Sequence, residues 1–216
     1  SFAYEHDKIP ALEHAISESC EALESKGLAP LPQVGAIHAV LVNGVAQLDH
    51  ASRVLLASVR SHPPSNSVSA KETYGWAARV LLDHYRGAIA AGDAPCESAL
   101  NLGIVSAGIQ EFDVAKGLFQ TAYGCLTDEP KAVAVVHWAD TMIRTGGGSD
   151  ALALLEKSLQ EFPAHFDTRW AIASTLAQLG RVPEARERYD ALLGSEDVTL
   201  EGKKHLQAER DALPQQ

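Results

Sequence analysis

Three side chains that can carry charge or bind a ligand share one stretch of predicted helix. His137 is followed by Asp140 after three residues and by Arg144 after four more, and residues at these intervals lie on one helix face. The plainer interpretation is an Asp–Arg pair on a solvated helix surface. The alternative is a polar anchor in a groove that orients a bound segment.

The sequence lacks the motifs that organise common catalytic and cofactor sites. It has no G-x-S-x-G elbow, no Walker-type phosphate loop, no H-E-x-x-H and no paired C-x-x-C. The nine histidines are scattered without ligand spacing. The glycine run Gly146–Gly148 lacks the preceding strand that a dinucleotide-binding loop needs, so we interpret it as a turn. We therefore expect no catalytic residues, no metal and no cofactor, and a protein that is not an enzyme.

Composition limits the class of protein and the class of partner. With 216 residues and 46% hydrophobic content, the chain is long enough to bury a core as one or two domains. The net charge of −10 argues against nucleic acid or an anionic membrane surface as the principal partner. The alanine-rich, lysine-poor composition favours a bacterial source.

The three cysteines are few, odd in number and without metal-type spacing, which indicates a reducing compartment and a cytoplasmic location. Cys96 and Cys125 fall in the same predicted repeat and could approach each other, but we expect them to be buried free thiols. No stretch approaches the roughly 18 consecutive apolar residues of a membrane span, and no signal-peptide pattern opens the chain.

Pairs of small residues recur in the second half of the chain, with the same spacing inside every pair. The interval from one pair to the next is nearly constant, and we call this interval the stride. The pairs are Gly103 with Ala115, Ala139 with Ala151, and Ala173 with Ala185. Each small residue occupies a place where two helices would touch closely. The step from the first pair to the second is two residues longer than the step from the second to the third, and we assign these two residues to a turn at Thr127–Pro130.

These residues resemble the tetratricopeptide repeat, whose pattern is W-x2-L-G-x2-Y, then A-x3-F, then P. The first copy reads Ala99-x2-Leu102-Gly103-x2-Ser106, then Ala115-x3-Phe119. The second reads Val135-x2-Trp138-Ala139-x2-Met142, then Ala151-x3-Leu155 and Pro163. The third reads Arg169-x2-Ile172-Ala173-x2-Leu176, then Ala185-x3-Tyr189.

The resemblance implies an all-α fold, an α-solenoid of antiparallel helix pairs in a right-handed superhelix, with about ten helices. Residues 1–95 would form divergent or capping N-terminal helices. Residues 96–213 would hold three repeats, at 96–131, 132–165 and 166–199, and a closing helix at 200–213. On that last helix we expect Leu206 and Leu213 to face the array, and Lys203, Lys204, Glu209 and Arg210 to face water.

Individual helices follow from the apolar pattern and from turn residues. The N-terminal ones are expected at Ser1–Lys26, Val34–Arg60 and Ser69–Ala91. The paired ones are expected at Cys96–Gly108 with Phe112–Leu126, Lys131–Thr145 with Asp150–Glu161, and His165–Leu179 with Pro183–Leu193.

Carried over place by place, the resemblance also implies a concave binding face on the first helix of each pair. The residues predicted to bind a partner there are Asn101, Ile104, His137, Asp140, Arg144, Trp170, Ser174 and Gln178, flanked by Glu97, Val133 and Asp167. These eleven residues together have a formal charge of −2, from three acids against one base, which favours an apolar or mildly basic peptide or helix as the ligand. Trp170 has two interpretations, a core residue or an exposed aromatic anchor for the partner.

The resemblance and the absence of catalytic motifs together favour a non-catalytic protein-interaction module or adaptor. Two alternatives stay open. Met142 is the only methionine, so Ser1 is not a native start as written. Either the initiator was removed, or the chain is a segment of something longer, such as the regulatory or recruiting part of a larger enzyme. The small residues of Val34–Arg60 would instead suit a homo-oligomeric scaffold, such as a homo-dimer.

Overall fold

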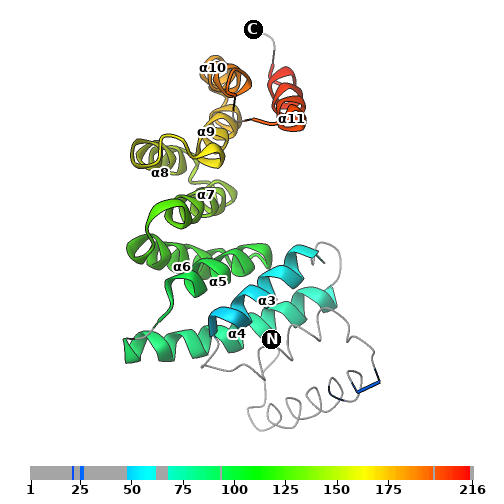
Figure 1. Ribbon diagram of the computed structural model, residues 1–216, viewed down its shortest axis with the longest axis vertical. Helices are drawn as coiled ribbons and strands as arrows, with labels where there is room; N and C mark the ends of the chain where they lie inside the picture. The colour runs from blue at the N-terminus through cyan, green and yellow to red at the C-terminus, as the bar shows by residue number, and fades with distance from the viewer. Residues whose placement is uncertain are drawn as a thin grey trace. The chain divides into compact units, whose positions relative to one another are not determined.

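The computed structural model describes residues 21, 25–26, 48–61, 68–92, 94–196 and 198–214. The chain divides into two compact units, Ser1–Leu118 and Phe119–Gln216. Every regular element in the described ranges is an α-helix (Figure 1), which confirms the all-α prediction. Except for residues 21, 25 and 26, the expected Ser1–Lys26 helix lies outside the described residues, as does the first part of Val34–Arg60.

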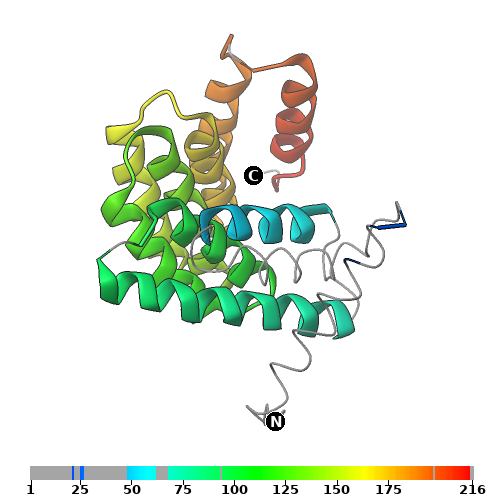
Figure 2. The same cartoon turned by 60° about the horizontal axis from the view of Figure 1, so that its bottom comes forward.

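Within its described residues, unit 1 contains α3 (Leu48–Ser61), α4 (Val68–Ala91) and α5 (Cys96–Gly108), followed by the first part of α6 (Phe112–Cys125). Helix α3 packs against both α4 and α5, and Figure 2 shows the long α4 running along α3. Each helix contributes a fully buried leucine to the core, Leu55, Leu81 and Leu102 respectively. Burial of these apolar faces holds the three helices together.

Unit 2 continues the chain through five further helices after the end of α6. They are α7 (Asp128–Arg144), α8 (Gly148–Glu161), α9 (Phe166–Gln178), α10 (Val182–Leu193) and α11 (Leu200–Asp211). Helix α7 packs on α8, α9 packs on α10, and α9 also contacts both α7 and α8. Figure 1 shows these helices following one another in chain order. This stacking of successive helix pairs is the α-solenoid arrangement predicted from the repeats.

The small residues of the stride are buried where the prediction needs them. Ala151, Ala173 and Ala185 have no exposed surface, and Ala139 is 1% exposed. Ala139, Ala151 and Ala185 belong to one core cluster together with Leu155. A methyl group at these sites lets two helix backbones approach closely, and larger side chains in such packed positions typically cost about 1–3 kcal/mol.

One turn geometry recurs at the same stride. Gln110, Gly146 and Gly180 have φ of 69°, 88° and 73°, and they are spaced along the chain as Gly103, Ala139 and Ala173 are. Each follows the first helix of a repeat, and the amide of the next residue closes the helix end. The Arg181 amide, for example, donates to the Leu176 carbonyl at 2.9 Å. A left-handed residue just past a helix end is a common stop, and it favours glycine.

Helix α7 begins inside the turn predicted at Thr127–Pro130, where Asp128 has a left-handed φ of 52°. It begins at Asp128 and has 17 residues, whereas α5 and α9 have 13 each. The segment Asp128–Pro130 therefore forms the first turn of α7. Proline is tolerated there because the first amides of a helix have no partner within the helix, and the acidic residues at 128 and 129 suit its positive end.

The cysteines also differ from the prediction. Cys96 and Cys125 are both disulfide-bonded, so the expectation of free thiols is wrong. Cys125 is exposed rather than buried. The sequence places both cysteines in the first repeat, where they could approach each other, but it does not decide whether a thiol stays free. No helix in the described ranges has the length and apolarity needed to cross a bilayer.

Candidate functional site

The three residues predicted on α7 lie on its partly exposed side. The Arg144 guanidinium and the Asp140 carboxylate are 3.9 Å apart, and their side chains are 41% and 60% exposed. The His137 ring stacks on Phe119 with centroids 6.2 Å apart and planes 15° from parallel. An exposed pair at this spacing contributes only about 0.3–0.5 kcal/mol to stability, so its charges stay largely solvated.

The two residues predicted on α5 belong to unit 1. The Asn101 amide donates to the Ser52 hydroxyl at 3.2 Å, and Ser52 is fully buried on α3. Ile104 is half-buried. Asn101 therefore ties α5 to α3, because a buried hydroxyl needs a hydrogen-bond partner.

Trp170 on α9 is half-buried and contacts the closing helix. Its Nε1–H donates to Glu209 Oε2 at 2.7 Å, and its ring lies 6.5 Å from the His205 ring. His205 Nε2 is in turn 3.2 Å from Glu209 Oε1. The tryptophan packs against a core cluster that includes Ala173 and Leu206. Helix α11 therefore covers part of Trp170, and the rest of its side chain is exposed.

Ser174 and Gln178 continue the row along α9. The Gln178 amide lies 3.5 Å from the Ser174 hydroxyl. The Tyr189 hydroxyl of α10 hydrogen-bonds to Ser174 and to Glu209. Burial, the charge of Glu209 and the hydrogen bond to Glu209 raise the pKa of Tyr189 to about 12, although the hydrogen bond with Ser174 acts in the opposite direction. Glu209 is therefore a shared acceptor that joins α11 to both α9 and α10.

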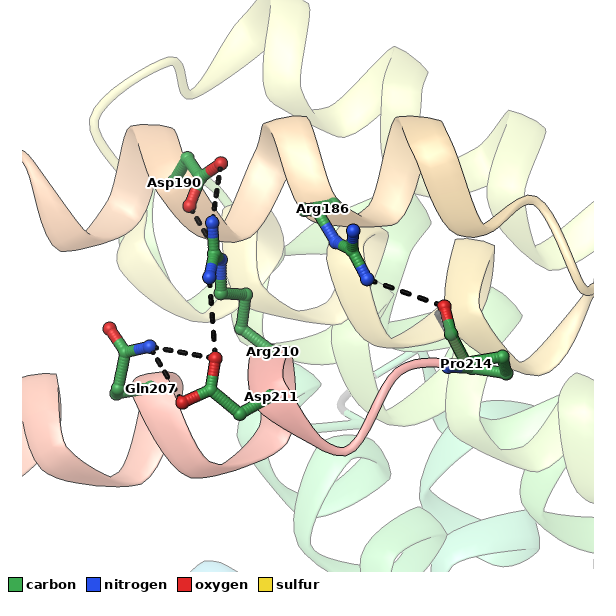
Figure 3. A network of polar contacts seen from close by, with 6 residues as sticks. All are labelled: Arg186, Asp190, Gln207, Arg210, Asp211 and Pro214. Atoms are coloured by element: carbon green, nitrogen blue, oxygen red, sulfur yellow. Dashed lines mark hydrogen bonds and ion pairs between the residues drawn. The ribbon is translucent and has the colours of Figure 1, made fainter. Parts of the chain in front are cut away.

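The contacts of α11 correct the expectation that Glu209 and Arg210 face water. Figure 3 shows Arg210 reaching α10, where its Nε and Nη2 donate to the two Asp190 carboxylate oxygens at 2.8 and 3.3 Å. Asp211 accepts from Arg210 and from Gln207. Leu206 is 1% exposed, as the sequence predicts. The sequence predicts the apolar stripe of α11, but the partners of the polar residues beside that stripe depend on how α11 is rotated against α10.

The described residues hold no group of three or more His, Cys, Asp or Glu side chains able to bind a metal ion. The first helices of the two repeats in unit 2, α7 and α9, carry a row of polar side chains over a buried apolar core. Such a row can form hydrogen bonds and ion pairs with another polypeptide.

The stride, the buried alanines and the recurring turn are all present across α7 to α10. Residues 145–200 match the tetratricopeptide repeat. This match covers α8, α9 and α10 and confirms the resemblance there. No curated protein sequence matches the chain at a significant level. Repeats of this kind generally serve protein–protein interaction, because their stacking creates extended binding surfaces.

Proposed function

We propose that this protein is a non-catalytic adaptor whose unit 2 binds a peptide or helix of a partner protein along the first helices of its repeats. The supporting observation is the repeat itself, a tetratricopeptide match over residues 145–200. The proposed contact residues on unit 2 are His137, Asp140, Arg144, Trp170, Ser174 and Gln178. A fold of this class hosts many partners, so the chemistry of these side chains must select among them.

The charges on α7 favour a ligand that satisfies both members of an ion pair. Asp140 and Arg144 are more than a third exposed, so a partner can approach them without first disrupting the core. The face is mildly acidic, and an apolar or mildly basic segment complements it better than an acidic one. We expect neither nucleic acid nor a bilayer to be the ligand.

An exchange of the two α7 charges tests this binding mode. The double variant Asp140→Arg/Arg144→Asp keeps an i,i+4 pair and changes stability by only a few tenths of a kcal/mol. Partners captured from a native lysate by the wild-type chain should be lost or weakened at least tenfold by this variant. The matched control exchanges Asp83 and Arg86, an exposed pair on α4 with side chains 74% and 70% exposed.

Equal capture by both double variants would argue against the α7 face. Turnover of a small substrate without any captured protein would argue against the adaptor itself. The cytoplasmic location stays a prediction, and the disulfide-bonded state of Cys96 and Cys125 weighs against it, because disulfides persist mainly in oxidising compartments.

A further inference from the structure

An open hollow with mostly apolar walls lies where α7 begins and where α8 is joined to α9. Its volume is about 400 Å³. Phe162, Ala164 and Phe166 are among its walls, and the two phenylalanines are half-buried. None of the eight predicted contact residues lines it. The hollow is therefore distinct from the row of polar side chains on α7 and α9.

Hydrogen bonds hold the connection between α8 and α9 in place. The Phe162 amide donates to the Ser158 carbonyl at 2.8 Å, and the His165 amide donates to the Phe162 carbonyl at 3.1 Å. The Thr168 amide donates to His165 Nδ1 at 3.2 Å, so His165 caps the start of α9 and its ring is neutral, because an accepting Nδ1 carries no proton. The hollow is therefore preformed, and a preformed site loses less conformational entropy when a ligand binds.

The charged side chain that lines the hollow is an acid. Glu129, in the first turn of α7, is exposed, and no lysine or arginine is among the described residues that line the hollow. The two segments that supply the walls, 128–132 and 161–169, contain four acids and two bases. The positive ends of α7 and α9 add only roughly half an elementary charge each. The surroundings of the hollow therefore stay negative.

Both bases of these segments have partners of their own. Lys131 Nζ is 2.7 Å from Glu161 Oε1. The Arg169 guanidinium donates to the Ser195 hydroxyl and to the Ala164 carbonyl, each at 3.4 Å. Neither base is one of the lining residues, so an acid is the charge that a ligand in the hollow meets first.

The hollow adjoins the predicted contact row. Ala132 and Phe166, two of its walls, directly precede Val133 and Asp167 in the chain. Val133 and Asp167 flank the predicted contact residues, so one bound segment can extend from the row into the hollow.

We propose that this hollow binds a large apolar side chain of the partner segment, next to a lysine or arginine in the partner's own sequence. The proposal rests on the adaptor function above, because the occupant belongs to the partner. The two phenylalanines offer apolar contact and suit aromatic rings packed edge to face. The Glu129 carboxylate attracts the neighbouring base and repels an acid in its place.

Titration of the isotope-labelled full chain with short peptides, followed by amide chemical shifts, tests the ligand chemistry. The first peptide is acetyl-Gly-Phe-Lys-Gly-amide. A second peptide has alanine in place of phenylalanine, and a third has glutamate in place of lysine. We expect the first peptide to produce saturable shifts at the start of α7 and in the connection between α8 and α9.

The other two peptides measure the apolar and the charged part of the recognition separately. The alanine peptide should bind about tenfold more weakly than the first, because it leaves the apolar walls uncovered. The glutamate peptide should bind about fivefold more weakly, because an exposed attraction becomes a repulsion. Equal affinity of the three peptides, or shifts that are confined to other parts of the chain, would overturn the proposal.

Removal of one charge tests the role of Glu129. Glu129→Gln keeps the size of the side chain and should reduce the preference for lysine over glutamate in the peptide to less than about twofold. Glu201→Gln is the matched control, because Glu201 is also an exposed acid in the first turn of a helix, α11, and lies outside the hollow. Full preference in Glu129→Gln, or an equal reduction in Glu201→Gln, would contradict this role.

A larger side chain in the wall localises the apolar contact. Ala164 is exposed, and Ala164→Leu fills part of the hollow without changing charge. We expect the first peptide to bind about tenfold more weakly to this variant, with thermal unfolding unchanged. Wild-type affinity in Ala164→Leu would show that the apolar side chain binds elsewhere.

Capture of partners from a native lysate separates this proposal from the adaptor function. Ala164→Leu should weaken the capture of the same partners that the exchange of the two α7 charges loses. Partners that Ala164→Leu retains in full, but that the α7 exchange loses, would overturn the hollow as a contact and leave the adaptor in place. Peptide binding at the hollow without any partner captured by the wild type would support the chemistry of the hollow and argue against the adaptor.

Discussion

Helices α7 and α9 occupy the same place in successive repeats but have different surroundings. Asp140 and Ser174 hold equivalent positions one repeat apart, as do Arg144 and Gln178. On α7 the polar pair is exposed and paired within its own helix. On α9, Trp170 donates to Glu209 of α11, and Ser174 bonds to Tyr189 of α10. The position within the repeat therefore fixes the helix face on which a side chain lies. The neighbouring helix decides how much of that side chain a partner can contact.

Replacement of Trp170 tests the α9 side of this comparison with the largest expected effect. Trp170→Ala should lower the free energy of unfolding by about 3 kcal/mol, because it removes a half-buried ring and one of the hydrogen bonds that Glu209 accepts. Trp170→Phe retains most of the packing and should lose only about 1 kcal/mol, the contribution of the hydrogen bond. Urea denaturation measures both. A loss in Trp170→Ala below about 0.5 kcal/mol, the range of ordinary surface substitutions, would identify the ring as a surface residue.

Alkaline pH should weaken the junction of α9, α10 and α11. The pKa of Tyr189 is raised to about 12 from an ordinary value near 10. Below about pH 10 the hydroxyl is neutral in both states and its contribution is complete. As the pH rises from about 10 to about 12, ionisation favours the unfolded chain and about 2 kcal/mol is lost. Tyr189→Phe should remove this part of the pH dependence, measured as the wild-type-minus-variant difference in unfolding free energy.

Substitution of the glycines in the turns that end α7 and α9 should change stability equally in both, whereas the polar surfaces of the two helices differ. Gly146 and Gly180 both have positive φ, and nothing lies within 4 Å of an added Cβ at either. Gly146→Ala and Gly180→Ala should each cost about 1 kcal/mol, because alanine is strained in the left-handed region. Gly124→Ala within helix α6 is the control and should stabilise by a similar amount. If thermal unfolding showed the control variant to be destabilised as much as the two turn variants, this account would be wrong.

The α7 pair should have the smallest effect on stability. Asp140→Ala and Arg144→Ala should each change the free energy of unfolding by no more than about 0.5 kcal/mol, because exposed ion pairs contribute little. Added salt should make this change in the free energy of unfolding smaller still, because it screens the attraction between the two charges. Denaturation of the wild type and the variants at low and high ionic strength measures the change. A loss above about 1 kcal/mol in either variant, beyond the range of exposed ion pairs, would show that α7 is as strongly committed to internal contacts as α9.

The sequence predicted well the features that depend on local pattern. The bounds of α5 were predicted without error, and those of α6 and of α8 to α10 within two residues. The alanines of the stride are buried as expected. The early start of α7 was missed because Pro130 signals a turn and a first helical turn equally well. The eight contact residues remain predictions, to be decided by binding experiments.

The sequence by itself determined the helices, their pairing and the sites of close approach, because apolar and small residues recur at a stride that only stacked helix pairs satisfy. The tertiary structure decided which polar groups meet. Glu209 joins Trp170 and Tyr189, and Arg210 joins Asp190. Such partnerships depend on the rotation of one helix against another, and a rotation by one residue, about 100°, would replace every partner while leaving the apolar stripe recognisable.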